Sequence, residues 1–255
     1  MGRDRTRSNF MRAEIAKCAA DNAPVLFLAD LSSQTEIHRL AEKLHRSFSR
    51  IDVLINNAAA MFADREATPE GLEKTFAINH LAPFILTHLV LGLISAAPAG
   101  RILTASSEFH SGTLEFSNLQ GERRYNWLGA YKRSKLCNIL FTYELARRLA
   151  GTTITANCFS PGPTLTRLGD NLPGLPAVFP WIVKRIPSLL AFPERSAITP
   201  VYVASSSDLI GVSGRFFLRC RTTCTKRITY DIDVAARLWS MSEAESSGTA
   251  LSQID

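Results

Sequence analysis

Glycine is scarce in the first part of this sequence, and no long apolar run occurs in it. Of the 14 glycines among 255 residues, Gly2 alone lies before position 71, which excludes a glycine-rich phosphate-binding turn from that region. No stretch reaches 18 unbroken apolar residues, so no transmembrane helix is predicted. The N-terminus is basic but lacks the apolar core of a signal peptide. These absences favour a soluble chain.

Paired cysteines and a concentrated basic surface are also missing. The five cysteines have no paired spacing; Cys220 and Cys224 are the one close couple, and no histidine lies near them in sequence. This pattern predicts reduced thiols, no metal site and a cytoplasmic location. The net charge of +6 comes from dispersed basic residues, without the basic stripe and interleaved aromatics that nucleic-acid binding requires. An anionic cofactor or a membrane surface suits this charge better.

Short apolar runs alternate with helical patterns along the chain, whose hydrophobic content of 46% is sufficient for one large core. The runs of strand length fall at 24–29, 51–55, 101–105, 153–159 and 214–219. Helices are predicted at 9–20, 37–48, 69–94, 129–150 and 193–205, with Thr68 as the N-cap of the third and a kink near Pro83. Such alternation predicts an α/β fold with a parallel sheet and helices on both faces.

Polar or conformationally special residues follow four of the predicted strands. Asp30, Asn57, Ser107 and Gly162 each stand just after an apolar run. In open parallel sheets, ligands bind beyond the carboxyl ends of the strands. The sequence therefore predicts one ligand site that gathers these four positions.

Tyr131 and Lys135 lie four residues apart, so a helix places them one turn apart on the same face. A lysine cation near a phenol favours the phenolate, which predicts a lowered pKa for Tyr131 and a usable acid or base near neutral pH. This pair suits proton transfer to or from an alcohol or carbonyl oxygen. The spacing alone also fits two residues on a solvated helix face.

The joint set of Asn57-Ala-Ala, Asn79, Ser107, Tyr131-x-x-x-Lys135 and Pro161-Gly162 resembles the short-chain dehydrogenase/reductase family. Three further stretches resemble its retinol-dehydrogenase and WW-domain-oxidoreductase-like branch: Thr75-Phe-Ala-Ile-Asn-His-Leu81, Asn118-Leu-Gln-Gly-Glu122 and Ser134-Lys-Leu-Cys-Asn-Ile-Leu-Phe141. The resemblance covers nearly the whole chain. It implies a Rossmann-type doubly wound sheet and hydride transfer between a nicotinamide cofactor and a carbonyl or alcohol.

The resemblance assigns four catalytic residues. Tyr131 is the expected general acid or base, and Lys135 is expected to lower its pKa and to bind the nicotinamide ribose. Ser107 is expected to hold the substrate oxygen, in preference to Ser106. Asn79 is expected to bend its helix and to support a proton relay through water to Lys135. For Ser107 and Asn79 the structural alternatives are a strand-ending turn and a satisfied helix backbone.

The resemblance also implies a set of cofactor-binding residues for NADP(H) or NAD(H): Arg3, Asp30, Leu31, Asn57, Ala58, Ala59, Tyr131, Lys135, Pro161, Gly162, Thr164 and Thr166. Asp30 is expected beside the adenine. Ala59 stands where the family usually has glycine, and Asn57 is alternatively a plain strand terminator. Arg3 matches the basic residue that receives a 2′-phosphate, so NADP is expected over NAD; a solvated Arg3 is the alternative.

The family's opening strand and its Thr-Gly-x-x-x-Gly-x-Gly turn have no counterpart in this sequence. The expected fold is thus a Rossmann-type sheet that lacks the first strand, the glycine-rich turn and most of the second strand. The expected layout is one domain over 1–241, truncated at its N-terminus, and a polar tail over 242–255. Two functions stay open: an NADP-dependent oxidoreductase, and a cofactor-binding-deficient remnant that acts through partner contacts.

The region at about 163–193 matches the family's substrate-covering segment and is rich in apolar residues. It suggests a small lipophilic carbonyl or alcohol substrate, retinoid-like or steroid-like, and contact with a membrane surface. Core packing or oligomer packing, including a homodimer, is the alternative for the same surface. A cytoplasmic location is expected, or the cytosolic face of a membrane if an anchor precedes the sequence.

Overall fold

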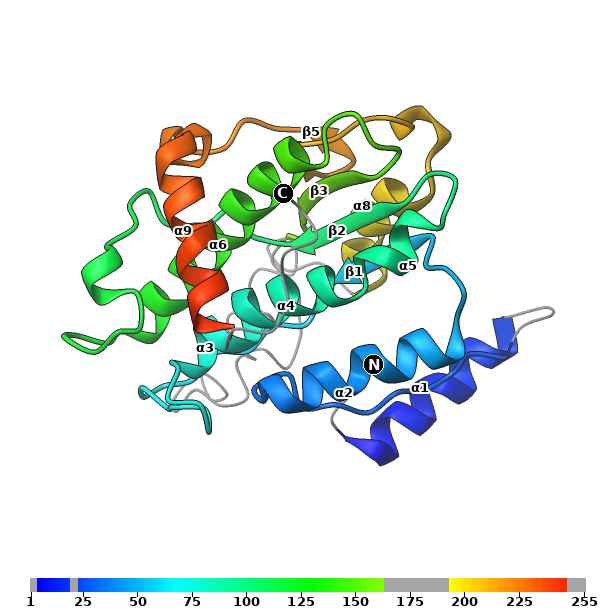
Figure 1. Ribbon diagram of the computed structural model, residues 1–255, viewed down its shortest axis with the longest axis horizontal. Coiled ribbons are helices and arrows are strands. Elements are labelled where there is room, and N and C mark those ends of the chain that lie inside the picture. Colours follow the sequence, from blue (N-terminus) through cyan, green and yellow to red (C-terminus); the bar gives the residue numbers. More distant parts are fainter. Residues whose placement is uncertain (1–3, 19–22, 163–192, 247–255) are drawn as a thin grey trace, which may run out of the picture.

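Five strands form one sheet at the centre of the computed structural model, which describes residues 4–18, 23–162 and 193–246 (Figure 1). In spatial order they are β1 (Val53–Asn56), β2 (Arg101–Ala105), β3 (Thr155–Ser160), β4 (Phe216–Leu218) and β5 (Arg221–Thr222). The first four pair in parallel, and β5 returns antiparallel to β4. The predicted parallel α/β fold is confirmed.

The helices are α1 (Arg5–Cys18), α2 (Gln34–Ser47), α3 (Lys74–Phe76), α4 (Ala82–Leu89), α5 (Leu91–Ser95), α6 (Trp127–Arg148), α8 (Pro193–Ser205) and α9 (Ile232–Glu245). A π-helical turn, η1 (Ala77–Leu81), joins α3 to α4. Short 3-10 turns are η2 (Phe116–Asn118), η5 (Ser207–Leu209) and η6 (Arg227–Tyr230).

Helices cover both faces of the sheet because alternate side chains of each strand point to opposite sides. Ile102 faces the layer of α4, α6 and α9, whereas the next residue, Leu103, packs with Val203 of α8 and Phe217. In Figure 1, α4, α6 and α9 lie in front of the strands and α8 lies behind them. Ile102 and Leu103 are fully buried, and each such side chain contributes about 1.5–3 kcal/mol.

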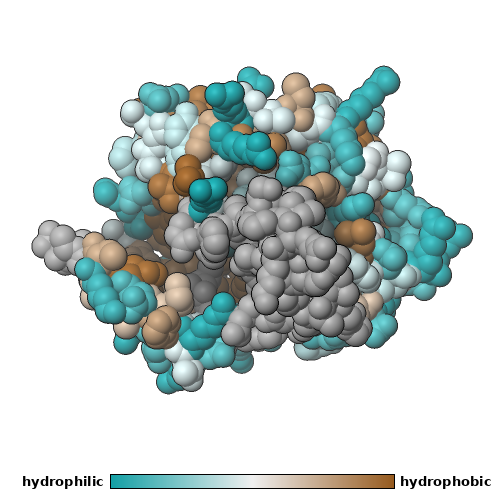
Figure 2. Space-filling view, turned by 180° about the vertical axis from the view of Figure 1, so that it is seen from behind, coloured by the Kyte–Doolittle hydropathy of each residue, from teal (hydrophilic) through white to brown (hydrophobic). Residues whose placement is uncertain are grey.

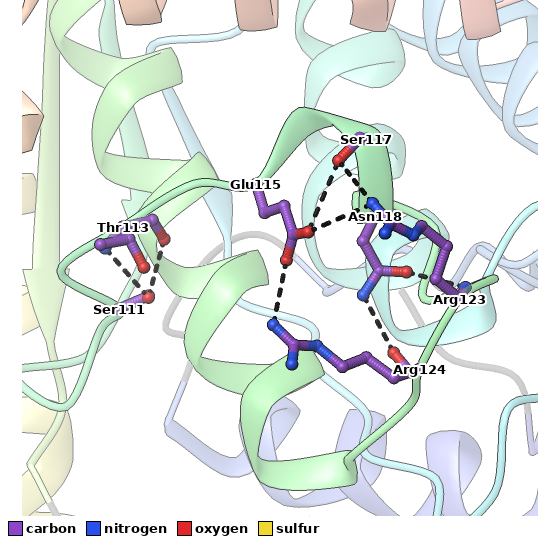
Figure 3. Close-up of polar contacts among 7 residues, drawn as sticks. All are labelled: Ser111, Thr113, Glu115, Ser117, Asn118, Arg123 and Arg124. Atoms are coloured by element: carbon purple, nitrogen blue, oxygen red, sulfur yellow. Dashed lines mark hydrogen bonds and ion pairs between the residues drawn. The ribbon is translucent and has the colours of Figure 1, made fainter.

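The long connection from β2 to α6 is organised by polar contacts around Asn118 (Figure 3). The Asn118 amide donates to the Arg124 carbonyl at 3.0 Å and accepts from the Arg123 backbone N–H at 2.9 Å. Glu115 lies 3.7 and 3.5 Å from the guanidinium groups of Arg123 and Arg124. These contacts close the loop just before Asn126, whose side chain caps α6 by accepting from Gly129 N–H.

The residues at 24–29 do not form the predicted strand of this sheet, which begins at β1 among the described residues. Instead Phe27 packs edge-on against Phe48 at 6.1 Å, and Ala29 joins the core. The run is apolar because it packs on α2 and the core, and a short apolar run does not distinguish this from a strand.

The predicted helix start at Thr68 is wrong. Residues 67–73 instead form a turn with Gly71 at φ 84°, closed by a bridge between Ala67 and Glu73. Helix α3 begins after Glu73, whose carboxylate accepts from the N–H groups of Thr75 and Phe76 at 2.7 and 2.9 Å. Glycine at a positive φ ends the local helical pattern, and a glutamate takes over the cap.

The C-terminal boundary expected at Ser242 falls inside α9, which continues to Glu245. Ser242 is fully buried and its hydroxyl lies 2.9 Å from His80 Nε2. Ser242 is therefore part of the core and does not begin a polar tail. Its hydroxyl can be buried because it hydrogen-bonds a buried histidine.

The surface seen from behind is mainly hydrophilic along its rim, with apolar residues interspersed (Figure 2). Helix α1 has no buried residue, and Phe10, Met11 and Ile15 on it are 64%, 50% and 53% exposed. Among the described helices, none combines the length and the apolar character needed to cross a bilayer.

Candidate functional site

Tyr131 and Lys135 lie in the first half of α6, on its face toward the ends of the strands. The Lys135 side chain is 2% exposed, and its Nζ donates to the Ala105 carbonyl at the end of β2, at 3.1 Å. The same Nζ lies 5.6 Å from the centre of the Tyr131 ring. The helix therefore holds the two side chains together, as their spacing predicts.

Ser107 follows β2, and its side chain lies near enough to Tyr131 to act on the pKa of that phenol, in the lowering direction. Its Oγ also accepts from the Phe109 backbone N–H at 3.1 Å. The neighbouring Ser106 turns the other way and donates from its Oγ to the Lys135 carbonyl at 2.6 Å. This arrangement supports Ser107 rather than Ser106 as the hydroxyl that faces a substrate oxygen.

Asn79 lies at the centre of the π-helical turn and is fully buried. Its side chain accepts from Ala60 N–H at 2.7 Å, and donates to Ala60 C=O and to Ser134 Oγ, each at 3.0 Å. Asn79 thus connects the segment after β1 to α6. The kink predicted near Pro83 corresponds to this π-helical turn, which is centred on Asn79.

Pro83 follows Asn79 by four residues and has no N–H to donate to the Asn79 carbonyl. That carbonyl accepts instead from the Asn138 side chain at 2.9 Å. The same Asn138 amide donates to Ala105 C=O at 2.9 Å, beside Lys135 Nζ. Asn138 therefore joins the bent helix, the end of β2 and the lysine in one network.

Sequence reasoning missed Asn138, Ser134 and Ala60. Ser134 and Asn138 follow Tyr131 by three and seven residues, which places them along the same helix face. Helical spacing from Tyr131 was the available signal for both. For Ala60 there was none, because it takes part through its backbone alone.

The electrostatics of the pair differ from the expectation for Tyr131. Burial raises the pKa of Tyr131, and the nearby Ser107 side chain opposes this effect. Burial lowers the pKa of Lys135 to about 8, because no carboxylate accompanies the ammonium among its described contacts. The predicted lowering of the Tyr131 pKa by Lys135 is thus not found here; the lysine is directed at the Ala105 carbonyl.

The residues expected to frame the cofactor lie beside this network. Asn57 and Ala58 are exposed after β1, and Ala59 is half-buried. Pro161 and Gly162 are half-buried after β3, and Gly162 has φ 76° with no atom of the described part of the chain within 4 Å of where a Cβ would lie. The ends of β1, β2 and β3 thus meet at one edge of the sheet, as predicted.

Asp30 and Leu31 occupy the turn before α2. The Asp30 carboxylate accepts from Ser32 N–H at 2.9 Å and from Ser32 Oγ at 2.8 Å, and Leu31 packs against the main core. Their position by the adenine ring stays a prediction. Arg3, Thr164, Thr166 and nearly all of the predicted substrate-covering segment lie outside the described residues.

Comparison with known proteins was made on the sequence and on the fold. The family model described as short chain dehydrogenase matches residues 3–173. Retinol dehydrogenase 14 of Homo sapiens is 39% identical over 220 residues, which cover 84% of this chain and 64% of that protein. Retinol dehydrogenase 11 of Homo sapiens is 32% identical over 241 residues, covering 94% and 74%. The chain thus spans less than two thirds of the length of retinol dehydrogenase 14.

Solved structures agree on the fold. An uncharacterized protein from Mycobacterium Paratuberculosis matches with a TM-score of 0.72 and 29% identity, over 96% of this chain and 82% of that one. A short chain dehydrogenase from Shigella flexneri 2a str. 301, complexed with NADP, matches with a TM-score of 0.62 and 22% identity, over 86% and 84%. The second likeness concerns the fold alone.

Proposed function

This chain belongs to the short-chain dehydrogenase family, and from that premise we propose that it transfers hydride between a nicotinamide cofactor and a carbonyl or alcohol carbon of a lipophilic substrate. One observation carries the proposal: Tyr131, whose pKa the nearby Ser107 side chain acts to lower, lies beside a buried Lys135. A phenol, a hydroxyl and an ammonium group converge where strands β1 to β3 end. Such a set can bind one oxygen atom and exchange a proton with it.

Each side chain then has a role in the reduction. Ser107 donates a hydrogen bond to the substrate oxygen and orients it. Tyr131, whose raised pKa keeps it protonated at neutral pH, donates a proton to that oxygen as charge develops. Lys135 binds the nicotinamide ribose, and Asn79 supports the return of a proton through water. The bound cofactor supplies the hydride in reduction and accepts it in oxidation.

The described residues fit the nicotinamide end of the cofactor better than its pyrophosphate. At Gly162 no atom of the described residues lies within 4 Å of where a Cβ would be, and Lys135 offers a donor for the ribose. For the pyrophosphate, no glycine occurs between Gly2 and Gly71 to let backbone amides approach closely. We therefore expect most of the binding free energy to come from the nicotinamide end, and the affinity for the whole dinucleotide to be weak.

NADP is the preferred cofactor in this proposal, because Arg3 offers a guanidinium to a 2′-phosphate. The Shigella flexneri short chain dehydrogenase of the same fold is a complex with NADP, which supports the choice. Arg3→Glu should then weaken NADPH binding more than NADH binding. Equal effects on both would contradict the assignment.

The substrate is proposed to be lipophilic. The relatives are named retinol dehydrogenases, and Phe109, beside Ser107, is 58% exposed. Substrates of this kind partition into membranes, and exposed Phe10, Met11 and Ile15 on α1, among basic residues, are suited to a membrane surface. We accordingly place the chain in the cytoplasm or at a cytosolic membrane face.

A homodimer is proposed as well. Ile198 and Val201 are exposed on α8 at 58% and 59%, and such apolar side chains are suited to contact with a second copy of the chain.

A second candidate is a chain that keeps this network but binds too little cofactor to turn over, and acts through partner contacts. The absence of a glycine-rich turn before Gly71 favours it. NADPH consumption separates the two candidates. The oxidoreductase consumes NADPH in a Tyr131-dependent manner at high cofactor concentration, and the remnant does not.

The test is NADPH oxidation with all-trans-retinal in detergent by the 255-residue chain, with Tyr131→Phe as the active-site variant. Loss of the proton donor should lower kcat by about 10²–10⁴-fold. Tyr202→Phe is the matched control, because Tyr202 lies on α8, across the sheet from α6. Equal rates in all three chains, or no rate in the unmodified chain, would refute the proposed function.

A further inference from the structure

The loop after β2 binds its own histidine. The Ser107 carbonyl accepts from the His110 backbone N–H at 3.2 Å and faces His110 Nδ1 at 2.9 Å. His110 is 4% exposed although it lies in a loop. Its ring packs beside Phe216 of β4, with 6.3 Å between ring centres. The imidazole thus lies directly behind the residue whose side chain lies near Tyr131.

The other side of the imidazole meets a segment far away in sequence. The Lys226 backbone N–H lies 3.3 Å from His110 Nε2, and Lys226 Nζ donates to the His110 carbonyl at 2.5 Å. Lys226 is itself fixed, because its carbonyl accepts from Thr229 N–H and Oγ at 2.9 and 2.8 Å. The histidine therefore bridges the Ser107 loop and the segment that leads into α9.

These partners determine where the imidazole proton lies. A carbonyl can only accept and a backbone N–H can only donate, so Nδ1 carries the proton toward Ser107 and Nε2 accepts from Lys226. Burial, and secondarily the charge of Lys226, lower the pKa of His110, and the bond to the Ser107 carbonyl opposes them. The neutral ring satisfies both contacts, and a protonated ring would present a second donor to the Lys226 N–H.

The position of the Ser107 hydroxyl depends on the same loop. Its Oγ accepts from Phe109 N–H, so its own proton is available for Tyr131. A shift of the Ser107 backbone would move both contacts. His110 is the side chain that holds this backbone from behind.

We propose that His110 is a positioning residue for Ser107: as a neutral ring protonated on Nδ1, it ties the Ser107 carbonyl to Lys226 and so keeps the Ser107 hydroxyl against Tyr131. The catalytic meaning of this contact rests on the proposed function. The contact itself does not, so the two can fail separately.

The tautomer is tested without any activity. In the unmodified chain, ¹⁵N NMR of labelled histidine should show His110 neutral at pH 7 with a protonated Nδ1 and an unprotonated Nε2. A predominantly Nε2-protonated or a charged His110 would overturn the inference.

The link to Ser107 is tested by amide exchange of Phe109, whose N–H reports the position of Ser107 Oγ. We expect His110→Phe to speed this exchange at least about tenfold, because Ser107 Oγ is then no longer held against the Phe109 N–H. Ser107→Ala should speed it similarly, because it removes the acceptor itself. His110→Asn, which keeps a donor near the Nδ1 position, should preserve most of the protection. His38→Phe, a half-buried histidine of α2, is the control. Unchanged Phe109 protection in a folded His110→Phe chain would overturn the inference.

Kinetics then separate positioning from general stability. His110→Phe should lower kcat roughly tenfold to a hundredfold while the cofactor KM stays within about twofold, since misplacement of a reacting group is costly. Adding Ser107→Ala to His110→Phe should cause no further loss beyond that of Ser107→Ala alone. Additive losses would overturn the inference. If the unmodified chain does not turn over, the proposed function fails, and the two NMR measurements still decide the role of His110.

Discussion

Lys135 is the residue in which function and stability conflict most directly. Lys135 is 2% exposed, and Ala105 C=O is the acceptor that the structure shows for its ammonium. Removing an ammonium from water without a carboxylate is unfavourable, which is why its pKa is lowered to about 8. A group retained at such a cost is a typical feature of a functional site.

Lys135→Met should therefore abolish turnover and stabilise the fold. At pH 7, below both the folded value of about 8 and the ordinary 10.5, the lysine is charged in both states. The folded state alone then bears the burial penalty, about 1.4 kcal/mol for each unit of pKa difference. We expect the free energy of unfolding to rise by about 1–3 kcal/mol in urea titrations at pH 7. The gain should shrink between pH 8 and 10.5, and a less stable variant at pH 7 would contradict this reasoning.

The pH dependence of turnover should reflect the same group. If a charged Lys135 binds the ribose, kcat/KM for NADPH falls as the pH rises through about 8, because the free chain then loses that charge. Tyr131, with its pKa raised, stays protonated over this range. A steady-state profile from pH 6 to 9.5 measures the effect. A flat profile to pH 9.5 would show that the lysine charge is not required.

Among the elements, the π-helical turn η1 shows how a proline shapes the site. Pro83 deprives the Asn79 carbonyl of its usual helical donor, and Asn138 supplies one from α6. π-helical turns within helices are frequent at functional sites. Here the turn directs Asn79 toward both Ala60 and Ser134.

Asn138→Ala should lower the free energy of unfolding by about 1–3 kcal/mol, since it leaves the buried Asn79 carbonyl without this donor. In a Pro83→Ala background the helix can supply an N–H to that carbonyl, so the cost of Asn138→Ala should be about 1 kcal/mol smaller. Urea unfolding of the two single variants and the double variant forms the thermodynamic cycle. Strictly additive costs would show that Pro83 and Asn138 are not coupled.

Helix α4 and the π-helical turn before it bury two histidines against α9. His80 lies 2.9 Å from Ser242 Oγ, and His88 Nδ1 donates to the Phe84 carbonyl at 2.7 Å. Burial lowers the pKa of each to about 4. Both rings are therefore neutral in the folded chain, whereas the unfolded chain takes up protons below pH 6.5.

Stability from these histidines is complete above pH 6.5 and is lost as the pH falls toward 4. The loss should reach about 3 kcal/mol for each histidine. His88→Phe removes one such group. Between pH 7 and 4 the free energy of unfolding of the unmodified chain should therefore fall by about 3 kcal/mol more than that of this variant. Urea unfolding at several pH values measures this, with His38→Phe, at a half-buried histidine of α2, as the control. A pH-independent difference between the two chains would contradict the reasoning.

The sequence predicted the elements whose signals are local. The strand at 101–105 and the helix at 193–205 were predicted with their observed bounds, because an apolar run and a proline start define them. The strand predicted at 24–29 was wrong, because a short apolar run can also pack against the core as an irregular segment. The pairing of Tyr131 with Lys135 followed from helical spacing. Asn138 was missed although its helical spacing from Tyr131 was a signal. His110 was missed because its ring contacts backbone atoms of Ser107 and Lys226, which no side-chain pattern indicates.

At the scale of the whole molecule, the groups of the proposed cofactor site are unevenly distributed. The ends of β2 and β3 and the start of α6 carry the groups that we propose for the nicotinamide ring and ribose. On the other side, β1 is the first strand of the sheet among the described residues, and Val53 and Ile55 on it are 37% and 40% exposed. A dinucleotide would extend from the ends of β2 and β3 across to the β1 edge. Its affinity therefore depends on both regions, and the described residues offer more polar groups in the first than in the second.

NADPH titration of the purified 255-residue chain, beside Lys135→Ala, measures this most directly. We expect saturable binding weaker than micromolar in the unmodified chain and none in Lys135→Ala, because Lys135 is the residue that we propose to bind the ribose. A micromolar or tighter dissociation constant would show that the pyrophosphate is held without a glycine-rich turn. Binding of equal strength in both chains would contradict the assignment of the Tyr131–Lys135 network as the nicotinamide site.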